Sequence, residues 1–555
     1  MSSRATNATL SEPLTFIDLF CGCGGFTLGM QRAGFRCVAA IDNNSEAIAV
    51  FEANFSDVPH VLEKDLAQFG PDKLATLTDC KKVDVIVGGP PCQGFSNVRK
   101  VDSSNHGSRV RRDKRRYLYR AFLRYVEYFR PKVFVMENVL GIQSAAKGKF
   151  FTAVQAEARA LGYRVHPQVE EAWTLGVPQK RRRQLIIGVR ADVPGYFPTR
   201  LLPPDRAWFN QDVPEDVSTL GDAIGDLPGL NAGGGEEERE YDLDQRERFL
   251  AVRGSRGAHY LKHIAEVSQA AKLTAHRARP HNGQDLRDFS RLREGEHSAE
   301  AIARGEAMEF TYDRECFKDR FKRQHREELC STVVAHLSKD GLMFIHPTQN
   351  RSLTPREAAR VQTFPDWFEF SVSRTHQFRI IGNAVPPLVG EAVGLEIRQF
   401  LCSAANQSLS HFKLSPLPTT DIHAGEWLLP LLDKKPHVLR RVAPGDFRRA
   451  WYAIAFLYPS LHPDGALDHG KTFVSEIQGR VIARHDDPRL LSPCYERSGW
   501  PMILTSIAKE AWRRYRHGEL SDDEFYCSDA QIAGMCFRNP RMAEQQIGRR
   551  VKIAA

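Results

Sequence analysis

The sequence lacks the features that mark secreted, membrane-spanning and repeat proteins. No apolar run approaches the ~20 residues that a bilayer-spanning helix needs. Residues 1–13, MSSRATNATLSEP, contain no apolar signal core, and we expect them to be a disordered lead-in. These absences predict a cytoplasmic protein without a membrane partner, in which the 11 cysteines are thiols rather than disulfides.

Metal-binding patterns are also missing from the sequence. Cys21 and Cys23 form a C-x-C pair, but no second pair of ligands lies near them. The late cysteines lack zinc spacing as well, and they are Cys494, Cys527 and Cys536. We therefore expect a protein that binds no metal ion.

The dinucleotide-binding pattern is missing as well, because the glycine-rich stretch CGCGG (21–25) does not match GxGxxG.

Positive charge is modest in total but is concentrated in two places. The 77 Lys and Arg residues exceed the 68 Asp and Glu residues, which gives a formal net charge of +9. Six of the eight residues in RVRRDKRR (109–116) and four of the five in QKRRR (179–183) are basic. A lone run of this kind is usually a solvated surface. Two runs that follow a candidate catalytic segment favour a nucleic acid as the partner.

The chain of 555 residues is long enough for about two to four domains. From residue 14 to residue 190, short apolar runs alternate with helical patterns. Buried strands are predicted at 14–20, 35–42, 83–89, 131–138 and 183–190, and helices at 46–55 and 117–129. This alternation predicts an α/β fold with a doubly wound, Rossmann-like sheet, which binds ligands at the carboxyl ends of its strands.

The rest of the chain divides into four segments. Residues 191–345 are rich in Pro, Gly and charge, and we expect an irregular region inserted into the core. Residues 346–402 return to the core, with a helix capped by Thr354 and a turn followed by an amphipathic helix at 380–401. A polar linker (403–422) precedes a mainly helical extension (423–555). DNA contact, partner docking and support of the core all remain open for that extension.

Side chains suited to ligand binding follow the first two predicted strands. FIDLFCGCGGF (16–26) is a strand that runs into a glycine-rich turn, and such a turn lets a ligand approach the backbone at a helix start. Asp42 ends the next strand, 42 − 20 = 22 residues beyond Phe20. An acidic residue at this place binds ribose hydroxyls in dinucleotide-binding folds. A plain tight turn is the alternative interpretation.

Side chains suited to catalysis follow the later strands. Cys92 lies in GGPPCQGFS (88–96), where inert packing, metal binding and nucleophilic attack are the alternatives. The cationic run that follows and the lack of metal partners favour a lowered thiol pKa and a nucleophile. Glu137 ends an apolar strand, which suits a general acid or hydrogen-bond donor, with a surface capping role as the alternative. Arg181 and Arg183 alternate along a strand and suit an anionic or carbonyl-rich substrate, or form only surface charge.

Six blocks of the sequence together resemble a known family. In order, DLFCGCGGF, PPCQGFS, ENV, QKRRR, RSLTPREAARVQTFPD and GNAVPP resemble the characteristic blocks of the DNA (cytosine-5) methyltransferases of bacterial restriction–modification or orphan type. The resemblance covers residues 14 to about 400 and implies that residues 191–345 are a target-recognition region. A tRNA cytosine-5 methyltransferase and a catalytically silent DNA-binding regulator are the alternatives. The long recognition region argues against the first, and the intact catalytic residues argue against the second.

The resemblance implies a catalytic role for five residues. Cys92 would add to carbon 6 of a cytosine that has been flipped out of the duplex. Glu137 would hold ring nitrogen 3 and the exocyclic amine, and Arg183 would contact the cytosine carbonyl. Asn138 would brace the loop that carries Cys92. Arg181 would support that loop and contact a nearby phosphate.

The same resemblance implies S-adenosylmethionine as the methyl donor. Asp42 would bind its ribose, and Asn383 would close the site. The other donor-binding residues would line or flank the ligand, and they are Phe20, Gly22, Gly24, Asp65 and Leu66. The segment 96–116 would close over the flipped base. The implied partners are double-stranded DNA and a cognate restriction endonuclease of the same system, for a monomeric, nucleoid-associated enzyme.

Overall fold

The computed structural model describes residues 13–91, 117–146, 148–190, 193, 197–198, 201–205, 208, 217–310, 321–406, 436–448, 451, 500–521 and 524–525. Cys92, the segment 96–116 and the cysteines at 494, 527 and 536 lie outside these described residues.

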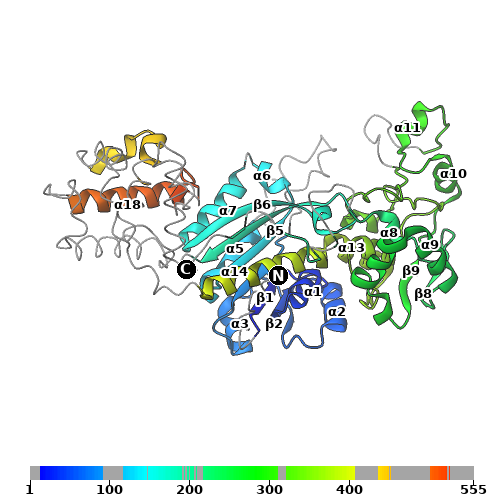
Figure 1. Ribbon diagram of the computed structural model, residues 1–555, viewed down its shortest axis with the longest axis horizontal. Coiled ribbons are helices and arrows are strands. Elements are labelled where there is room, and N and C mark those ends of the chain that lie inside the picture. Colours follow the sequence, from blue (N-terminus) through cyan, green and yellow to red (C-terminus); the bar gives the residue numbers. More distant parts are fainter. Residues whose placement is uncertain are drawn as a thin grey trace, which may run out of the picture.

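A seven-stranded sheet forms the centre of the molecule (Figure 1). Its strand order is β3-β2-β1-β4-β5-β7-β6. The first five strands in this order pair in parallel, whereas β7 is antiparallel to both of its neighbours. The strands are β1 (Thr15–Leu19), β2 (Arg36–Asp42), β3 (Val61–Glu63), β4 (Val85–Gly88), β5 (Val133–Asn138), β6 (Tyr163–Glu171) and β7 (Arg182–Arg190).

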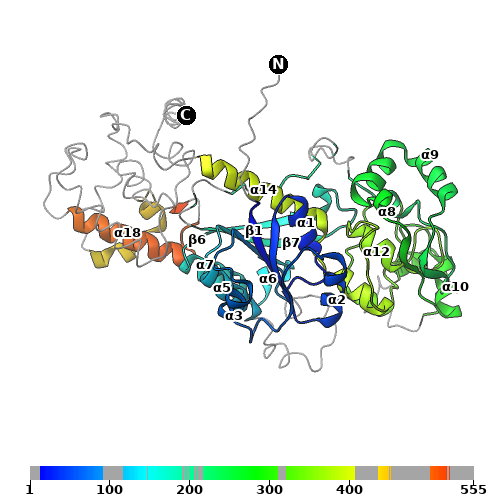
Figure 2. The same cartoon turned by 90° about the horizontal axis from the view of Figure 1, so that it is seen from below.

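Helices cover both faces of this sheet, which confirms the predicted doubly wound fold (Figures 1 and 2). Alternate strand residues enter opposite cores, because successive side chains of a strand point to opposite faces. Val133 and Val135 of β5 pack on the side of α1 (Gly25–Arg32), α2 (Ser45–Asn54) and α14 (Pro387–Asn406). Phe134 and Met136 pack on the other side. The helices there are α3 (Pro71–Thr78), α5 (Leu118–Phe129) and α7 (Lys149–Ala160), with the short α6 (Gly141–Ser144) between β5 and α7.

All five predicted strands are present, each within two residues of its expected limits. Two further strands, β3 and β6, were not predicted. β3 has only three residues, too few for a periodic pattern. β6 mixes polar residues with apolar ones and contains Pro167, and it lies at the edge of the sheet, where proline is tolerated.

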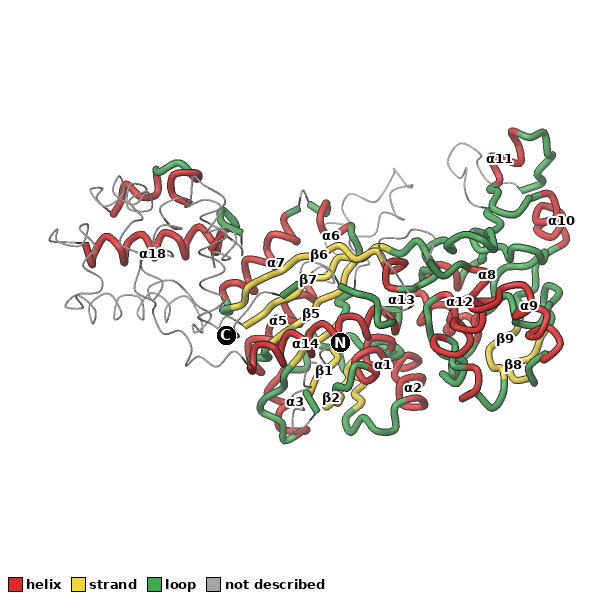
Figure 3. Tube along the Cα trace, in the orientation of Figure 1, coloured by secondary structure: helices red, strands yellow, loops and turns green. Residues whose placement is uncertain are grey.

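Residues 191–345, which are predicted to be the recognition region and are called so below, contain regular elements between irregular stretches (Figure 3). The weak periodicity of its sequence did not indicate these elements. A two-stranded antiparallel sheet joins β8 (Gly235–Arg239) to β9 (Leu273–Arg277), and a small core around Phe289, Phe321 and Ile345 holds one end of the region together. The helices are α8 (Leu220–Ile224), α9 (Leu243–His259), α10 (Gly283–Arg291) and α11 (Ser298–Ala303).

Helix α12 (Pro355–Val361) joins the recognition region to the core. As predicted, Thr354 caps it, by accepting a hydrogen bond from the backbone N–H of Glu357. All seven of its residues are buried. Arg360 forms ion pairs with Asp226 of the recognition region and with Asp366, and all three side chains are fully buried. Buried charges are stable only when they are paired, so these contacts hold the recognition region in a fixed position relative to α12.

The helical stretch Arg374–Cys402, which spans α13 (Arg374–Asn383) and most of α14, is long and apolar enough to cross a membrane by composition alone. In the structure, 78% of its most apolar window is buried against the rest of the protein. It therefore behaves as a core helix of the doubly wound fold.

The described part of the C-terminal extension is helical and lies at the opposite end of the molecule from the recognition region (Figures 1 and 2). It contains a 3₁₀-helix, Pro436–Arg441, and the helix α18 (Trp500–Arg516). Trp451, Tyr515 and Phe525 stack in its small core. The Tyr515 hydroxyl donates to the backbone carbonyl of Tyr163 at 3.1 Å. Tyr163 begins β6, so the extension docks at the amino end of the sheet.

Candidate active site

The turn after β1 has an unusual backbone, with open space beside Gly22. Phe20, Gly22 and Gly24 all have positive φ angles, of 60°, 56° and 92°. A Cβ atom on Gly24 would lie 2.3 Å from the Phe55 ring, so only glycine fits there. A Cβ atom on Gly22 would meet nothing within 4 Å. The backbone at Gly22 is thus accessible for a ligand to approach closely.

Asp42, at the end of β2, holds this turn in place. Its Oδ2 accepts from the backbone N–H of Gly22 at 2.9 Å, and its Oδ1 accepts from the backbone N–H of Asn44 at 2.9 Å. Burial raises the pKa of Asp42 above the usual value for an aspartate. The carboxyl group therefore lies directly beside the open part of the turn, where a ribose-binding group is expected.

Asp65 and Leu66 follow β3, the next strand along the same edge of the sheet. Asp65 Oδ1 accepts from the backbone N–H of Ala67 at 2.9 Å, and Leu66 is buried. Arg124 of α5 donates to the carbonyl of Leu66 at 2.7 Å. No local sequence pattern indicated that Arg124 holds the backbone at Leu66, because the two residues are 58 positions apart.

The strand ends of β4, β5 and β7 form the second half of the site. Arg183 Nε lies 2.9 Å from Glu137 Oε1, and both side chains are largely shielded from solvent. Asn138 is buried, and its amide donates to the Pro90 carbonyl at 3.2 Å. Pro90 stands two residues before Cys92, which lies outside the described residues. Because β7 is antiparallel to β5, the start of β7 lies beside the end of β5 and brings Arg183 to this edge.

Arg181 is fully shielded, with only 1% of its surface exposed. Its guanidinium donates to the carbonyls of Val333 at 3.0 Å and Ala384 at 2.8 Å. It therefore does not share the surroundings of Arg183, and this geometry favours support of neighbouring loops over contact with a phosphate. Ala384 follows Asn383, the exposed last residue of α13. Arg181 thus links the start of β7 to the segment that carries Asn383.

One buried carboxyl beneath the turn was missed by sequence reasoning. Asp18 lies on β1, only 1% exposed, and its Oδ2 accepts from the Thr27 hydroxyl at 2.7 Å. Burial raises the pKa of Asp18 to about 7. The signal available in the sequence was a charged residue inside the apolar run FIDLF.

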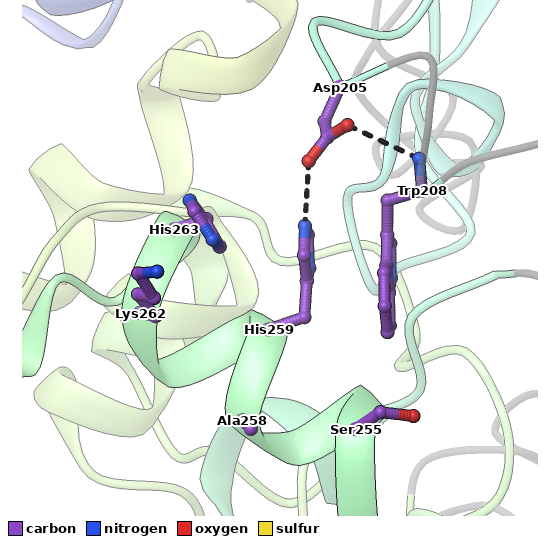
Figure 4. Close-up of a pocket in the computed structure, with 7 residues that line it drawn as sticks. All are labelled: Asp205, Trp208, Ser255, Ala258, His259, Lys262 and His263. Atoms are coloured by element: carbon purple, nitrogen blue, oxygen red, sulfur yellow. Dashed lines mark hydrogen bonds and ion pairs between the residues drawn. The ribbon is translucent and has the colours of Figure 1, made fainter.

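Among the described residues, no cluster of three or more His, Cys, Asp or Glu side chains could hold a metal ion. A pocket of about 380 Å³ lies between Asp205, Trp208 and the C-terminal end of α9 with the turn that follows it (Figure 4). There the Trp208 indole stacks on His259 at 4.2 Å between ring centroids, and Asp205 Oδ2 lies 2.9 Å from His259 Nε2, from which it accepts when that nitrogen carries a proton. It shares no residue with the strand ends described above, so it belongs to the recognition region.

The fold and this edge of the sheet define a methyltransferase with a Rossmann-like core. The family model of the C-5 cytosine-specific DNA methylases matches residues 14–399. The chain therefore belongs to this family, and it is a methyltransferase that acts on carbon 5 of cytosine in DNA. This result decides against the tRNA methyltransferase and the silent regulator.

Individual relatives agree with this assignment. The chain is 34% identical over 395 residues to the type II methyltransferase M.DdeI of Desulfomicrobium norvegicum, which covers 69% of this chain and 88% of that protein. It is 33% identical over 380 residues to M1.HphI of Haemophilus parahaemolyticus, covering 68% and 85%. A prophage-encoded E. coli protein, described as a candidate DNA modification methyltransferase, has a solved structure with a TM-score of 0.51 and 27% identity, covering 70% of this chain and 99% of that one.

Proposed function

We propose that the chain transfers the methyl group of S-adenosylmethionine to carbon 5 of a cytosine within a specific double-stranded DNA sequence, as a DNA (cytosine-5-)-methyltransferase with Cys92 as its nucleophile. The observation that carries the proposal is the pairing of Glu137 with Arg183 beside Pro90. A carboxylate and a guanidinium at one strand edge suit the amine and the carbonyl of a cytosine. Cys92 follows Pro90 by two residues in the sequence.

The proposed reaction begins when the target base leaves the stack, which costs roughly a few kcal/mol. The Cys92 thiolate adds to carbon 6, and the displaced electrons are taken up at ring nitrogen 3 as the Glu137 carboxyl group donates a proton to it. Glu137 also accepts from the exocyclic amine, and Arg183 donates to the carbonyl, so the product of the addition is a neutral enamine with carbon 5 as its nucleophilic atom. Carbon 5 then takes the methyl group, and the sulfonium of the donor becomes a thioether. Loss of the carbon 5 proton to a base, followed by elimination of the Cys92 thiolate, releases 5-methylcytosine.

For the donor, we propose that Asp42 binds the ribose and that Asn383 closes the site. The open space at Gly22 and the fixed position of Asp42 beside it support this arrangement. The residues that line or flank the donor in this proposal are Phe20, Gly22, Gly24, Asp65 and Leu66.

Two residues act through their neighbours in this proposal. Asn138 braces the cysteine loop, and its hydrogen bond to the Pro90 carbonyl supports that role. Arg181 holds the segment at Ala384, which supports a positioning role without phosphate contact.

We further propose a cytoplasmic monomer that acts in a restriction–modification system, with a cognate endonuclease as a partner in the system rather than in direct contact. The names of the type II relatives support this context. The proposed domain limits are 14–190 and 346–402 for the core, 191–345 for recognition, 403–422 for the linker and 423–555 for the extension. The end of the family match at residue 399 supports the separation of the extension.

A duplex that carries 5-fluorocytosine at the target tests the covalent step. Fluorine cannot leave as the proton does, so we expect a stable protein–DNA adduct in the presence of the donor. Cys92→Ser should form no adduct and should lose at least about a thousandfold in turnover, because a hydroxyl is a far weaker nucleophile than a thiolate. Bisulfite mapping of DNA from expressing cells would supply the target sequence beforehand. An adduct that persists in the Cys92→Ser variant would refute the assignment of the nucleophile.

A further inference from the structure

Helix α13 carries three polar residues on one stripe. His376, Arg379 and Asn383 are separated by three and four positions, a spacing that places them on the same face of a helix. Asn383 is the residue proposed to close the donor site. Contacts that hold His376 and Arg379 in place therefore also determine the position of Asn383.

Glu46, in the first turn of α2, holds both of these residues. Its Oε1 lies 2.7 Å from His376 Nδ1, and its Oε2 lies 3.3 Å from Arg379 Nη2. Oε2 also accepts from the Asn44 side-chain amide at 2.9 Å. One carboxylate thus joins two segments that are more than 300 residues apart in the sequence.

The same contacts lead directly to the ribose-binding side of the donor site. Asn44 caps α2, and its backbone N–H donates to Asp42. A second tie, between the side chain of Asn54 at the other end of α2 and the backbone of Glu369, fixes the far end of the helix. Helix α2 is therefore fastened at both ends to the segment that includes α13.

We propose that Glu46 is a positioning residue for the methyl donor, which keeps Asn383 and Asp42 at a fixed separation on opposite sides of one ligand. This inference rests on the donor site described under the proposed function. Glu46 itself does not touch the donor. It acts by preventing α13 from moving away from α2 when the donor is bound.

An exposed ion pair contributes little to stability. The side chains of Glu46, His376 and Arg379 are 30–40% exposed, so breaking the contact leaves no buried charge. Loss of Glu46 should consequently leave the melting temperature almost unchanged. The loss of Glu46 should instead lower the affinity for the donor, because binding of the donor must then restrain α13 without the contact to α2.

Isothermal titration of S-adenosylmethionine into the full chain without DNA tests this proposal. We expect Glu46→Gln to raise the Kd about three- to tenfold, since the ion pair with Arg379 and the contact with His376 are both lost. Arg379→Ala should raise the Kd by a smaller factor, because the contact between Glu46 and His376 remains, and Arg379→Lys should restore part of the affinity. The double variant Glu46→Gln/Arg379→Ala should be no worse than the poorer single variant, because both changes remove one shared contact.

Glu52→Gln is the matched control, since Glu52 lies exposed on the same helix and should bind the donor like the wild type. In steady-state assays Glu46→Gln should raise the KM for the donor and leave kcat at saturating donor within about twofold. Equal donor affinity in Glu46→Gln and Glu52→Gln, or additive losses in the double variant, would overturn the proposal. If Asp42→Ala binds the donor as tightly as the wild type, the proposed donor site itself is wrong. That outcome is distinguishable from failure of the Glu46 proposal alone.

Discussion

Asp18 shows what a single buried carboxyl does to a fold that must hold a ligand. It lies on β1 beneath the glycine-rich turn and accepts a hydrogen bond from Thr27, in the first turn of α1. Among the described residues its second oxygen has no hydrogen-bond partner. Burial raises its pKa to about 7, because an ionised carboxylate there loses its hydration.

This pKa predicts a stability that falls with increasing pH. The folded chain retains a proton on Asp18 that the unfolded chain releases near pH 4. The stabilisation is complete below that pH and is lost as pH rises through about 7. Each pH unit in between costs up to about 1.4 kcal/mol. Asp18→Asn, which resembles the protonated side chain in shape, should have a melting temperature that declines less between pH 5 and pH 8.

The control for Asp18→Asn is the same change at an exposed carboxyl of the same domain. Asp72, in the first turn of α3, is such a residue, and Asp72→Asn is the control variant. Its pH profile of melting temperature should run parallel to that of the wild type. Parallel profiles for Asp18→Asn and the wild type would show that Asp18 is ionised in the folded protein.

Sequence reasoning at this scale identified the residues within motifs and missed the residues that hold them. Asp42 and Glu137 lie at the carboxyl ends of parallel strands, so their common edge could be predicted from that pattern. Arg183 reaches the same edge because β7 is antiparallel to β5, which the pattern of parallel strands does not predict. Arg124 and Glu46 act on partners 58 and 333 residues away. No local pattern encodes such contacts, because they depend on how whole elements pack.

At the scale of elements, α12 contrasts with residues 191–345, the predicted recognition region. Its helical pattern and its Thr354 cap were predictable, since both depend on neighbouring residues. Three arginines around it, Arg351, Arg356 and Arg360, are fully buried, which is rare for arginine unless it is paired. The basic residues of this helix therefore contribute to the interior rather than to a DNA-binding surface.

We predict that Arg360→Ala destabilises the protein by about 3–5 kcal/mol, because it leaves Asp226 and Asp366 buried without their partner. Urea denaturation measures the loss. Arg248→Ala removes an arginine of α9 whose one hydrogen bond within the described part of the chain is to Gln245, and it should change stability by less than about 0.5 kcal/mol. Similar losses in the two variants would contradict a structural role for the buried pair.

Seen as a whole molecule, the protein separates its two appendages across the sheet. The recognition region and the extension lie at opposite ends (Figures 1 and 2). Methyl transfer is proposed at the carboxyl ends of the strands, whereas Tyr515 attaches the extension to Tyr163 at the amino end. The extension therefore does not reach the target base through its described residues.

Tyr515→Ala should loosen the extension without slowing methyl transfer. Removing a buried aromatic side chain costs about 3–5 kcal/mol, and here the stacking on Phe525 and the hydrogen bond to Tyr163 are also lost. We expect faster proteolysis within the extension and an unchanged initial rate of DNA methylation. His517→Ala, an exposed change just beyond α18, should alter neither. A methylation rate that falls together with protease resistance would show that the extension takes part in catalysis.

The ion pair between Glu137 and Arg183 also has a consequence for which base the site accepts. The carboxyl group can accept a hydrogen bond from the amine of cytosine, while the guanidinium can donate one to its carbonyl. Thymine and uracil present a second carbonyl where cytosine has its amine, and two oxygens would then face each other without a proton between them. A buried acceptor that is left without a hydrogen bond weakens binding by about 1–3 kcal/mol, and by more when it is charged. If Glu137 and Arg183 bind the base as proposed, the pair is in place before any DNA arrives and distinguishes cytosine from thymine and uracil by the polarity of the substituent at carbon 4.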